Sequence, residues 1–168
     1  MPGTEPARKG SEEALRLAKA RRDTSGLADA LRVYLDSCVL IYRIEQRAPW
    51  AGLVNDRLAL IEANRATMVI SELTRLECRV RPIALGRTDM LSDYDRFFEQ
   101  PMLAWQALDR PVFELATRLR AESRLKTADA LHLAAAMTAG CQQFVTNDLR
   151  LARAAAGRID VVALDNAA

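Results

Sequence analysis

Short apolar runs alternate with amphipathic stretches along most of this chain. The runs are rich in β-branched and aromatic side chains and predict strands over 33–36, 67–70, 103–107, 143–146 and 159–164. The stretches between them predict helices over about 37–46, 54–64, 71–82 or 71–86, 88–98, 109–123, 128–139 and 148–155. Regular strand–helix alternation predicts an α/β fold in which helices cover both faces of a central parallel sheet.

The first 32 residues follow a different pattern. Residues 1–10 hold two prolines, two glycines and few apolar side chains, which favours disorder. Residues 11–22 open with a serine and two glutamates and end in basic residues, as a helix does, and a shorter helix is expected over 27–31. We therefore predict a partly disordered N-terminal helical extension, 1–32, ahead of a single domain, 33–168.

Composition places the chain among ordinary globular proteins. It has 168 residues, half of them hydrophobic, which is enough for one domain with a real core. No apolar stretch is long enough to span a bilayer, and residues 1–10 lack the apolar segment of a secretory signal, so we expect a cytoplasmic protein that does not bind membranes. The three cysteines form no C-x-x-C pair, which argues against a thiolate zinc site.

Charge gives no warrant by itself for nucleic-acid binding. Residues 1–32 carry seven basic and five acidic side chains, and residues 33–168 carry 17 of each. A domain without net charge does not attract nucleic acid as a whole. Of its 17 cations, 16 are arginines, which could grip phosphate where they cluster or could simply cover helix surfaces.

Four carboxylates stand where buried segments meet open ends. Asp36 ends one predicted strand, Asp148 comes just after another, Glu77 lies on the helix after a third, and Asp129 is in the first turn of an apolar helix. The carboxyl ends of parallel strands lie on one edge of a sheet, where α/β proteins hold ligands. Clustered carboxylates at that edge indicate a site for a hard divalent cation.

Each acid also has a simpler interpretation. Asp36 and Asp148 could cap the helices that follow them. Asp129 could simply be stabilised by the positive end of its own helix dipole. Glu77 could pair on the helix surface with Arg81, four residues on. The only histidine, His132, comes one turn after Asp129 and could be a ligand or a hydrogen-bonded histidine at a helix or subunit contact.

Four blocks in order give the chain a specific family likeness: Val33–Tyr42, Ser71–Cys78, Thr127–Ala136 and Phe144–Asp148. With them the chain resembles the PIN-domain nucleases, and among these the VapC-like toxins of bacterial toxin–antitoxin pairs. The third block, with Thr-Ala-Asp-Ala-Leu-His, is the most recognisable, and the fourth ends in Val-Thr-Asn-Asp. The front departs from the family, whose toxins usually begin within a few residues of the first strand.

The resemblance implies an Mg²⁺-dependent or Mn²⁺-dependent endoribonuclease whose catalytic acids are Asp36, Glu77, Asp129 and Asp148. Because Mg²⁺ keeps several waters, Asp36 and Asp129 are expected to bind it directly, and Glu77 and Asp148 directly or through water. The supporting polar residues would be Ser37, Thr146 and Asn147. The implied partners are an RNA substrate, a cognate antitoxin and a second copy of the chain in a homodimer.

Two other functions fit the same residues. One is a PIN-fold nuclease that processes RNA outside toxin–antitoxin biology, and the other is a non-catalytic PIN-like binding protein. The homodimer interface is expected from apolar side chains on helices 54–64 and 88–98, which could equally belong to the core: Leu58, Ile61, Met90, Leu91 and Phe97.

Overall fold

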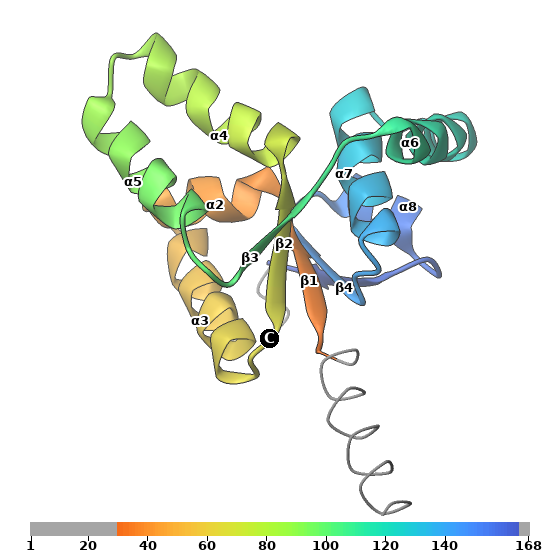
Figure 1. Cartoon of the computed structure of the whole chain (residues 1–168), viewed down its shortest axis with the longest axis horizontal. Helices are drawn as coiled ribbons and strands as arrows, with labels where there is room; N and C mark the ends of the chain where they lie inside the picture. Colours follow the sequence, from red (N-terminus) through yellow and green to blue (C-terminus); the bar gives the residue numbers. More distant parts are fainter. Residues whose placement is uncertain (1–29, 165–168) are drawn as a thin grey trace, which may run out of the picture. The chain divides into compact units, whose positions relative to one another are not determined.

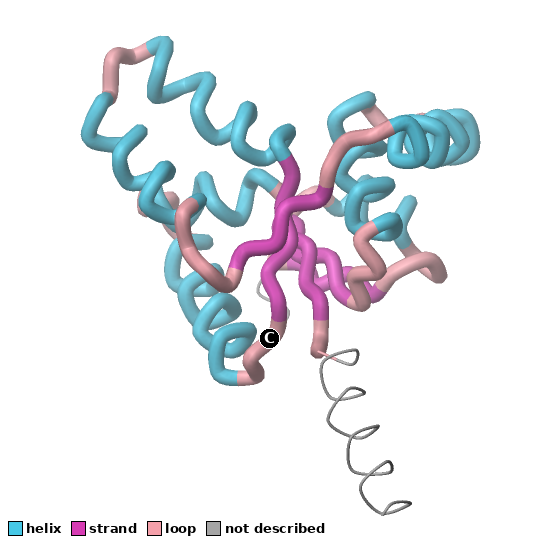
Figure 2. Tube along the Cα trace, viewed as in Figure 1, coloured by secondary structure: helices cyan, strands magenta, loops and turns pink. Residues whose placement is uncertain are grey.

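The structure is a computed structural model and describes residues 30–164. Its strands are β1 (Arg32–Leu35), β2 (Thr67–Ser71), β3 (Leu103–Gln106), β4 (Gln143–Thr146) and β5 (Asp160–Ala163). Its helices are α2 (Ser37–Ile44), α3 (Trp50–Ala63), α4 (Glu72–Ala84), α5 (Thr88–Phe98), α6 (Arg110–Ser123), α7 (Thr127–Thr138) and α8 (Leu149–Ala155). Figures 1 and 2 show these helices standing around a central sheet.

All five strands pair in parallel, in the order β3-β2-β1-β4-β5. The central strand β1 pairs with β2 on one side and with β4 on the other, so that Tyr34 lies opposite both Val69 and Phe144. The chain builds outward from β1 to β3 and then returns to β4 and β5. The direction of the strand order therefore reverses between β1 and β4, which is where α/β sheets open a crevice for ligands.

Side chains of successive strand residues enter two separate cores. Val33 and Leu35 pack with α2, α3 and α5, whereas Tyr34 and Phe144 pack with α6, α7 and α8. Figure 1 shows the same division, with α2, α3, α4 and α5 on one side of the sheet and α6, α7 and α8 on the other. The predicted fold class, a parallel sheet flanked by helices on both faces, is confirmed.

Two helix starts differ from their predictions in an informative way: α3 begins four residues early, and the N-cap of α7 is a different residue. Helix α3 begins at Trp50, four residues early, because Pro49 precedes it and the Trp50 ring stacks on Tyr42 with ring centroids 4.8 Å apart. Helix α7 begins at Thr127, and Lys126 rather than Thr127 occupies the N-cap position. Lys126 makes no side-chain cap hydrogen bond, so the first amides of α7 stay open to another acceptor.

Some of the predicted elements fall outside the described range. The disorder expected over 1–10 and the helix over 11–22 lie wholly outside it. The short helix expected over 27–31 overlaps it only at Ala30 and Leu31, which are not helical. Within residues 30–164, no helix combines the length and apolar character needed to cross a membrane.

Most of the side chains expected at a homodimer interface belong to the core instead. Leu58, Ile61 and Phe97 are at most 3% exposed, and Met90 is partly buried against the same cluster. They are buried because α3 and α5 turn these faces toward the sheet. These buried side chains are therefore not available to an interface between two copies of the chain.

Candidate active site

A cavity of about 560 Å³ opens beyond the carboxyl ends of β1 and β4 and brings the four predicted acids together. Its walls include Asp36 after β1, Asp148 after β4, Glu77 on α4 and Asp129 on α7. Asp36 and Asp148 lie close together because their strands, β1 and β4, are neighbours in the sheet. Glu77 and Asp129 join them because α4 and α7 pass the same edge of the sheet. The cavity lies at the β1–β4 reversal that the fold favours for ligand binding.

Asp36 is held by the residues that begin the next helix and end the neighbouring strand. Its Oδ1 accepts the backbone N–H of Ser37 at 2.7 Å, which makes it the N-cap of α2. Its Oδ2 accepts the hydroxyl of Thr146 at 2.6 Å, and Thr146 Oγ1 accepts the backbone N–H of Asp148 at 3.0 Å. The predicted capping role of Asp36 is confirmed, and buried Thr146 ties the ends of β1 and β4 together.

Glu77 points into the site rather than along the surface of α4. Its Oε2 accepts the Ser37 hydroxyl at 2.6 Å and lies 2.9 Å from His132 Nε2. Burial raises the pKa of Glu77, but the hydrogen bonds from His132 and Ser37 outweigh it and hold that pKa below its ordinary value. The expected pair with Arg81 is wrong, because Arg81 forms an ion pair with Glu45 instead.

His132 connects Glu77 to a buried chain of hydrogen bonds. The imidazole is 2% exposed, with Nδ1 3.0 Å from the Tyr34 hydroxyl, which in turn lies 3.0 Å from Ser71 Oγ. An ionised carboxylate can only accept a hydrogen bond, so in the neutral imidazole Nε2 carries the proton and its N–H donates a hydrogen bond to Glu77. Nδ1 then accepts from Tyr34, and the chain runs in one direction from Ser71 to the carboxylate of Glu77.

Asp129 and Asp148 stand in contrasting electrostatic surroundings. Burial, followed by the charges of Asp148 and Asp36, raises the pKa of Asp129 against the opposing effect of Lys126 and Arg150. Burial also acts to raise the pKa of Asp148, but its hydrogen bonds with Arg150 and Leu151 bring that pKa below the ordinary value. Asp148 is the N-cap of α8, as predicted.

The raised pKa of Asp129 gives a prediction for the metal-free protein. The folded state binds the Asp129 proton more tightly than the unfolded state, so the ionised carboxylate disfavours folding once the pH exceeds that pKa. Asp129→Asn should therefore raise the free energy of unfolding at pH 7 in EDTA, and the gain should vanish as the pH falls below the ordinary range for aspartate. Urea unfolding across this pH range measures it. A loss of stability at pH 7 would contradict the repulsion inferred here.

The donor set of the cavity fits a hard cation. Asp36, Glu77 and His132 each offer one atom within 4.8 Å of the others, and Asp129 and Asp148 line the same space. Because His132 Nε2 donates to Glu77, its lone pair is not available, and carboxylate oxygens remain as ligands. An oxygen-only set suits Mg²⁺ or Mn²⁺.

The structure adds residues that the sequence did not single out. Tyr34 belongs to a buried strand and resembles ordinary core, and its hydroxyl gives no signal in the sequence. Arg150 lines the cavity with its guanidinium 3.3 Å from Asp148, and Cys38 Sγ lies 3.6 Å from Asp36 Oδ2. Predicted Asn147 also lines the cavity, where its amide donates to Tyr42 at 3.2 Å.

Comparisons with known proteins agree with this fold. The chain is similar to one in the crystal structure of VapBC2 from Rickettsia felis bound to promoter DNA, with 18% identity and a TM-score of 0.65, covering 80% of this chain and all of that one. A DNA-bound VapBC from Salmonella typhimurium gives 21% identity and a TM-score of 0.63, covering 80% of this chain and 99% of its own. At such identities these likenesses show the fold.

Another structural likeness is to FitAcB from Neisseria gonorrhoeae, with 20% identity and a TM-score of 0.60, covering 79% of this chain and 97% of that one. No curated protein sequence matches the chain. The family model for the PIN domain matches residues 33–157, which is most of the chain and contains all four acids. The predicted resemblance is confirmed, and the chain belongs to the PIN-domain family.

Proposed function

We propose that this protein is a metal-dependent endoribonuclease that acts as the toxin of a toxin–antitoxin pair. The observation that carries the proposal is the gathering of Asp36, Glu77, Asp129 and Asp148 around one cavity in a PIN domain. Four carboxylates without a cation would repel one another, and their proximity is best explained by a divalent ion between them.

In the proposed site Asp36 and Asp129 hold Mg²⁺ or Mn²⁺ directly, and Glu77 and Asp148 hold it directly or through water. When bound, the cation would lower the pKa of a water molecule and offset the charge of the scissile phosphate. Thr146 and Ser37 fix the oxygens of Asp36 and Glu77 through their hydroxyls. His132 fixes Glu77 from the other side, so that the carboxylates are oriented before RNA arrives.

The toxin role is supported by the related structures and by an apolar stripe on α4. The structures of Rickettsia felis VapBC2 and of a toxin–antitoxin complex from Klebsiella pneumoniae contain chains of this fold. On α4, Leu76, Val80 and Ile83 follow a helical spacing and are each more than half exposed. We propose that an apolar antitoxin segment covers this stripe, since α2 and α4 also supply Ser37 and Glu77 to the site.

The catalytic half of the proposal is tested by RNA cleavage. The purified protein should cut RNA in Mg²⁺ or Mn²⁺, stop in EDTA and resume when metal is restored. Asp129→Asn should show no cleavage above background. Cleavage that persists in EDTA, or in this variant, would refute the metal mechanism. Binding without cleavage in any divalent metal would favour a non-catalytic PIN-like protein.

The toxin half is tested separately in bacteria. Induced expression of the chain alone should arrest growth, and expression of Asp129→Asn should not. A protein that cuts RNA in vitro but leaves growth unchanged would instead fit RNA processing outside toxin–antitoxin biology.

A further inference from the structure

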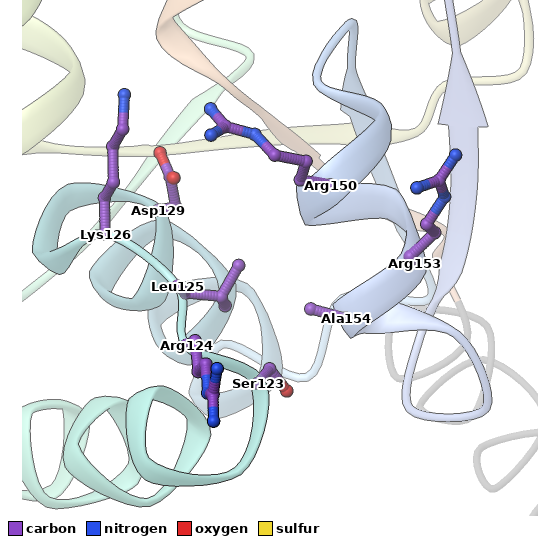
Figure 3. A pocket seen from close by; sticks show the side chains of 8 residues that line it. All are labelled: Ser123, Arg124, Leu125, Lys126, Asp129, Arg150, Arg153 and Ala154. Carbon is purple, nitrogen blue, oxygen red and sulfur yellow. The ribbon is translucent and has the colours of Figure 1, made fainter.

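A second cavity, of about 400 Å³, adjoins the acidic one and is lined mainly by cations. Arg124, Lys126, Arg150 and Arg153 line it, and Asp129 is its single acid. Asp129 and Arg150 also line the acidic cavity, so the two spaces share a wall. Figure 3 shows Lys126 and Arg150 on either side of Asp129, whereas Arg153, also on α8, extends its guanidinium to the side of that helix away from Asp129.

Two cations of this cavity, Lys126 and Arg153, differ from most others in the domain. Arg47, Arg79, Arg87 and Arg158, for example, are each paired with a carboxylate. Within residues 30–164, the side chains of Lys126 and Arg153 form neither an ion pair nor a hydrogen bond. Because residues 33–168 carry equal numbers of acids and bases, the excess of cations that line this cavity is a local feature and not a property of the whole domain. Unpaired cations grouped around a cavity are suited to an anion.

The start of α7 adds to the positive character of the cavity. Lys126 is the N-cap of this 12-residue helix, and its side chain leaves the first-turn amides without a cap. Helix N-termini carry partial positive charge and open N–H groups, which together favour phosphate. The floor formed by Leu125 and Ala154 is apolar and would tolerate a sugar or a base beside that phosphate.

We propose that this cavity binds a backbone phosphate of the RNA strand, next to the phosphate that is cut in the acidic cavity. The proposal rests on the proposed nuclease function and names the feature of the substrate that the second cavity recognises. The shared wall at Asp129 and Arg150 makes one continuous path for a single strand. Contacts to phosphate position a strand without reading its bases, so the site should act equally on RNA of any sequence.

The test measures RNA binding rather than cleavage. A labelled short single-stranded RNA is titrated in EDTA at several salt concentrations, and gels confirm that the RNA stays intact. Lys126→Gln/Arg153→Gln should weaken binding at low salt by roughly tenfold or more. The slope of log affinity against log salt should also decrease by about 0.7 for each phosphate that the variant no longer neutralises.

The matched control is Arg57→Gln/Arg118→Gln, which removes the same charge from α3 and α6 at positions that line neither cavity. This control should bind RNA like the wild type, and both double variants should keep the wild-type melting temperature. Equal weakening by the two pairs, or wild-type binding by the cavity pair, would overturn the proposal.

Cleavage separates this inference from the function on which it rests. If the wild type cuts RNA in Mg²⁺ but the cavity pair binds RNA normally, the nuclease stands and the phosphate site fails. If the cavity pair alone weakens RNA binding but no metal supports cleavage, the phosphate site stands and the nuclease fails.

Discussion

Asp36→Asn should reduce Mg²⁺-dependent RNA cleavage by roughly a thousandfold, equivalent to about 4 kcal/mol of transition-state stabilisation. Asp36 is the most central of the four acids, since its carboxylate contacts Ser37 and Thr146 and lies 3.9 Å from His132 Nε2. An amide presents one neutral oxygen in place of two charged ones, and it would bind the cation far more weakly. The variant should also lose the rise in melting temperature that Mg²⁺ or Mn²⁺ gives the wild type.

The same substitution should leave the metal-free fold nearly intact. Asparagine caps helices as well as aspartate does, so its oxygen can still accept the Ser37 amide at the start of α2. The new NH₂ group can donate a hydrogen bond to Thr146 Oγ1, where the carboxylate accepted one from the Thr146 hydroxyl. We expect the free energy of unfolding in EDTA to change by less than about 1 kcal/mol.

Asp56→Asn is the matched control for this prediction. Asp56 is exposed on α3 and does not line the cavity. Its substitution makes the same chemical change, from a carboxylate to an amide, away from the proposed metal site. It should keep wild-type cleavage and the wild-type response to metal. Wild-type cleavage by Asp36→Asn would contradict the proposed metal site. If the variant lost activity because it unfolded, its defect would be structural, and the prediction of an intact metal-free fold would be wrong.

His132→Leu should affect both stability and metal dependence, because it interrupts the hydrogen-bond chain from Tyr34 to Glu77. Leucine fills much of the space but neither donates to Glu77 nor accepts from Tyr34. We expect a loss of about 1–3 kcal/mol in the free energy of unfolding, from polar groups left without partners. The metal concentration for half-maximal cleavage should rise by roughly 10- to 100-fold, since Glu77 would no longer be held.

His132→Gln distinguishes a positioning role from a purely structural one. A glutamine amide can donate from nitrogen and accept at oxygen, so it can replace both hydrogen bonds of the imidazole. It should recover most of the metal dependence lost in His132→Leu. Tyr34→Phe tests the next link, because it keeps the ring that stacks on Phe144 and removes only the hydroxyl. A leucine variant with wild-type metal dependence would show that His132 only fills space.

Several features of the site could be predicted from local sequence. Asp36 and Asp148 each follow an apolar run that can only be a buried strand, and parallel strands end on one edge of a sheet. Their capping roles also follow from position, because a short polar side chain before a helix accepts its first amides. For the same reason, most predicted element boundaries lie within a residue or two of those observed.

Other features depend on contacts between distant segments. Glu77 and Arg81 have the spacing of a surface ion pair. In the structure, however, Arg81 forms an ion pair with Glu45, and Glu77 is hydrogen-bonded to His132. Leu58 and Phe97 have apolar spacing that fits an interface as well as a core, and only the packing of α3 and α5 on the sheet decides between them. Tyr34 becomes part of the site because its hydroxyl meets Ser71 at the end of the neighbouring strand β2 and His132 on α7.

By itself, then, the sequence determined the family, the order of the strands and helices and the acids at the strand ends, since each depends on short-range patterns of side chains. The tertiary structure decided which partner each acid contacts, that His132 holds Glu77, and that Lys126 and Arg153 line the same cavity. Each of these contacts joins residues that are far apart in the chain. Sequence patterns do not reveal them, because hydrogen bonds and charges act over a few ångströms of space, whatever the separation along the sequence.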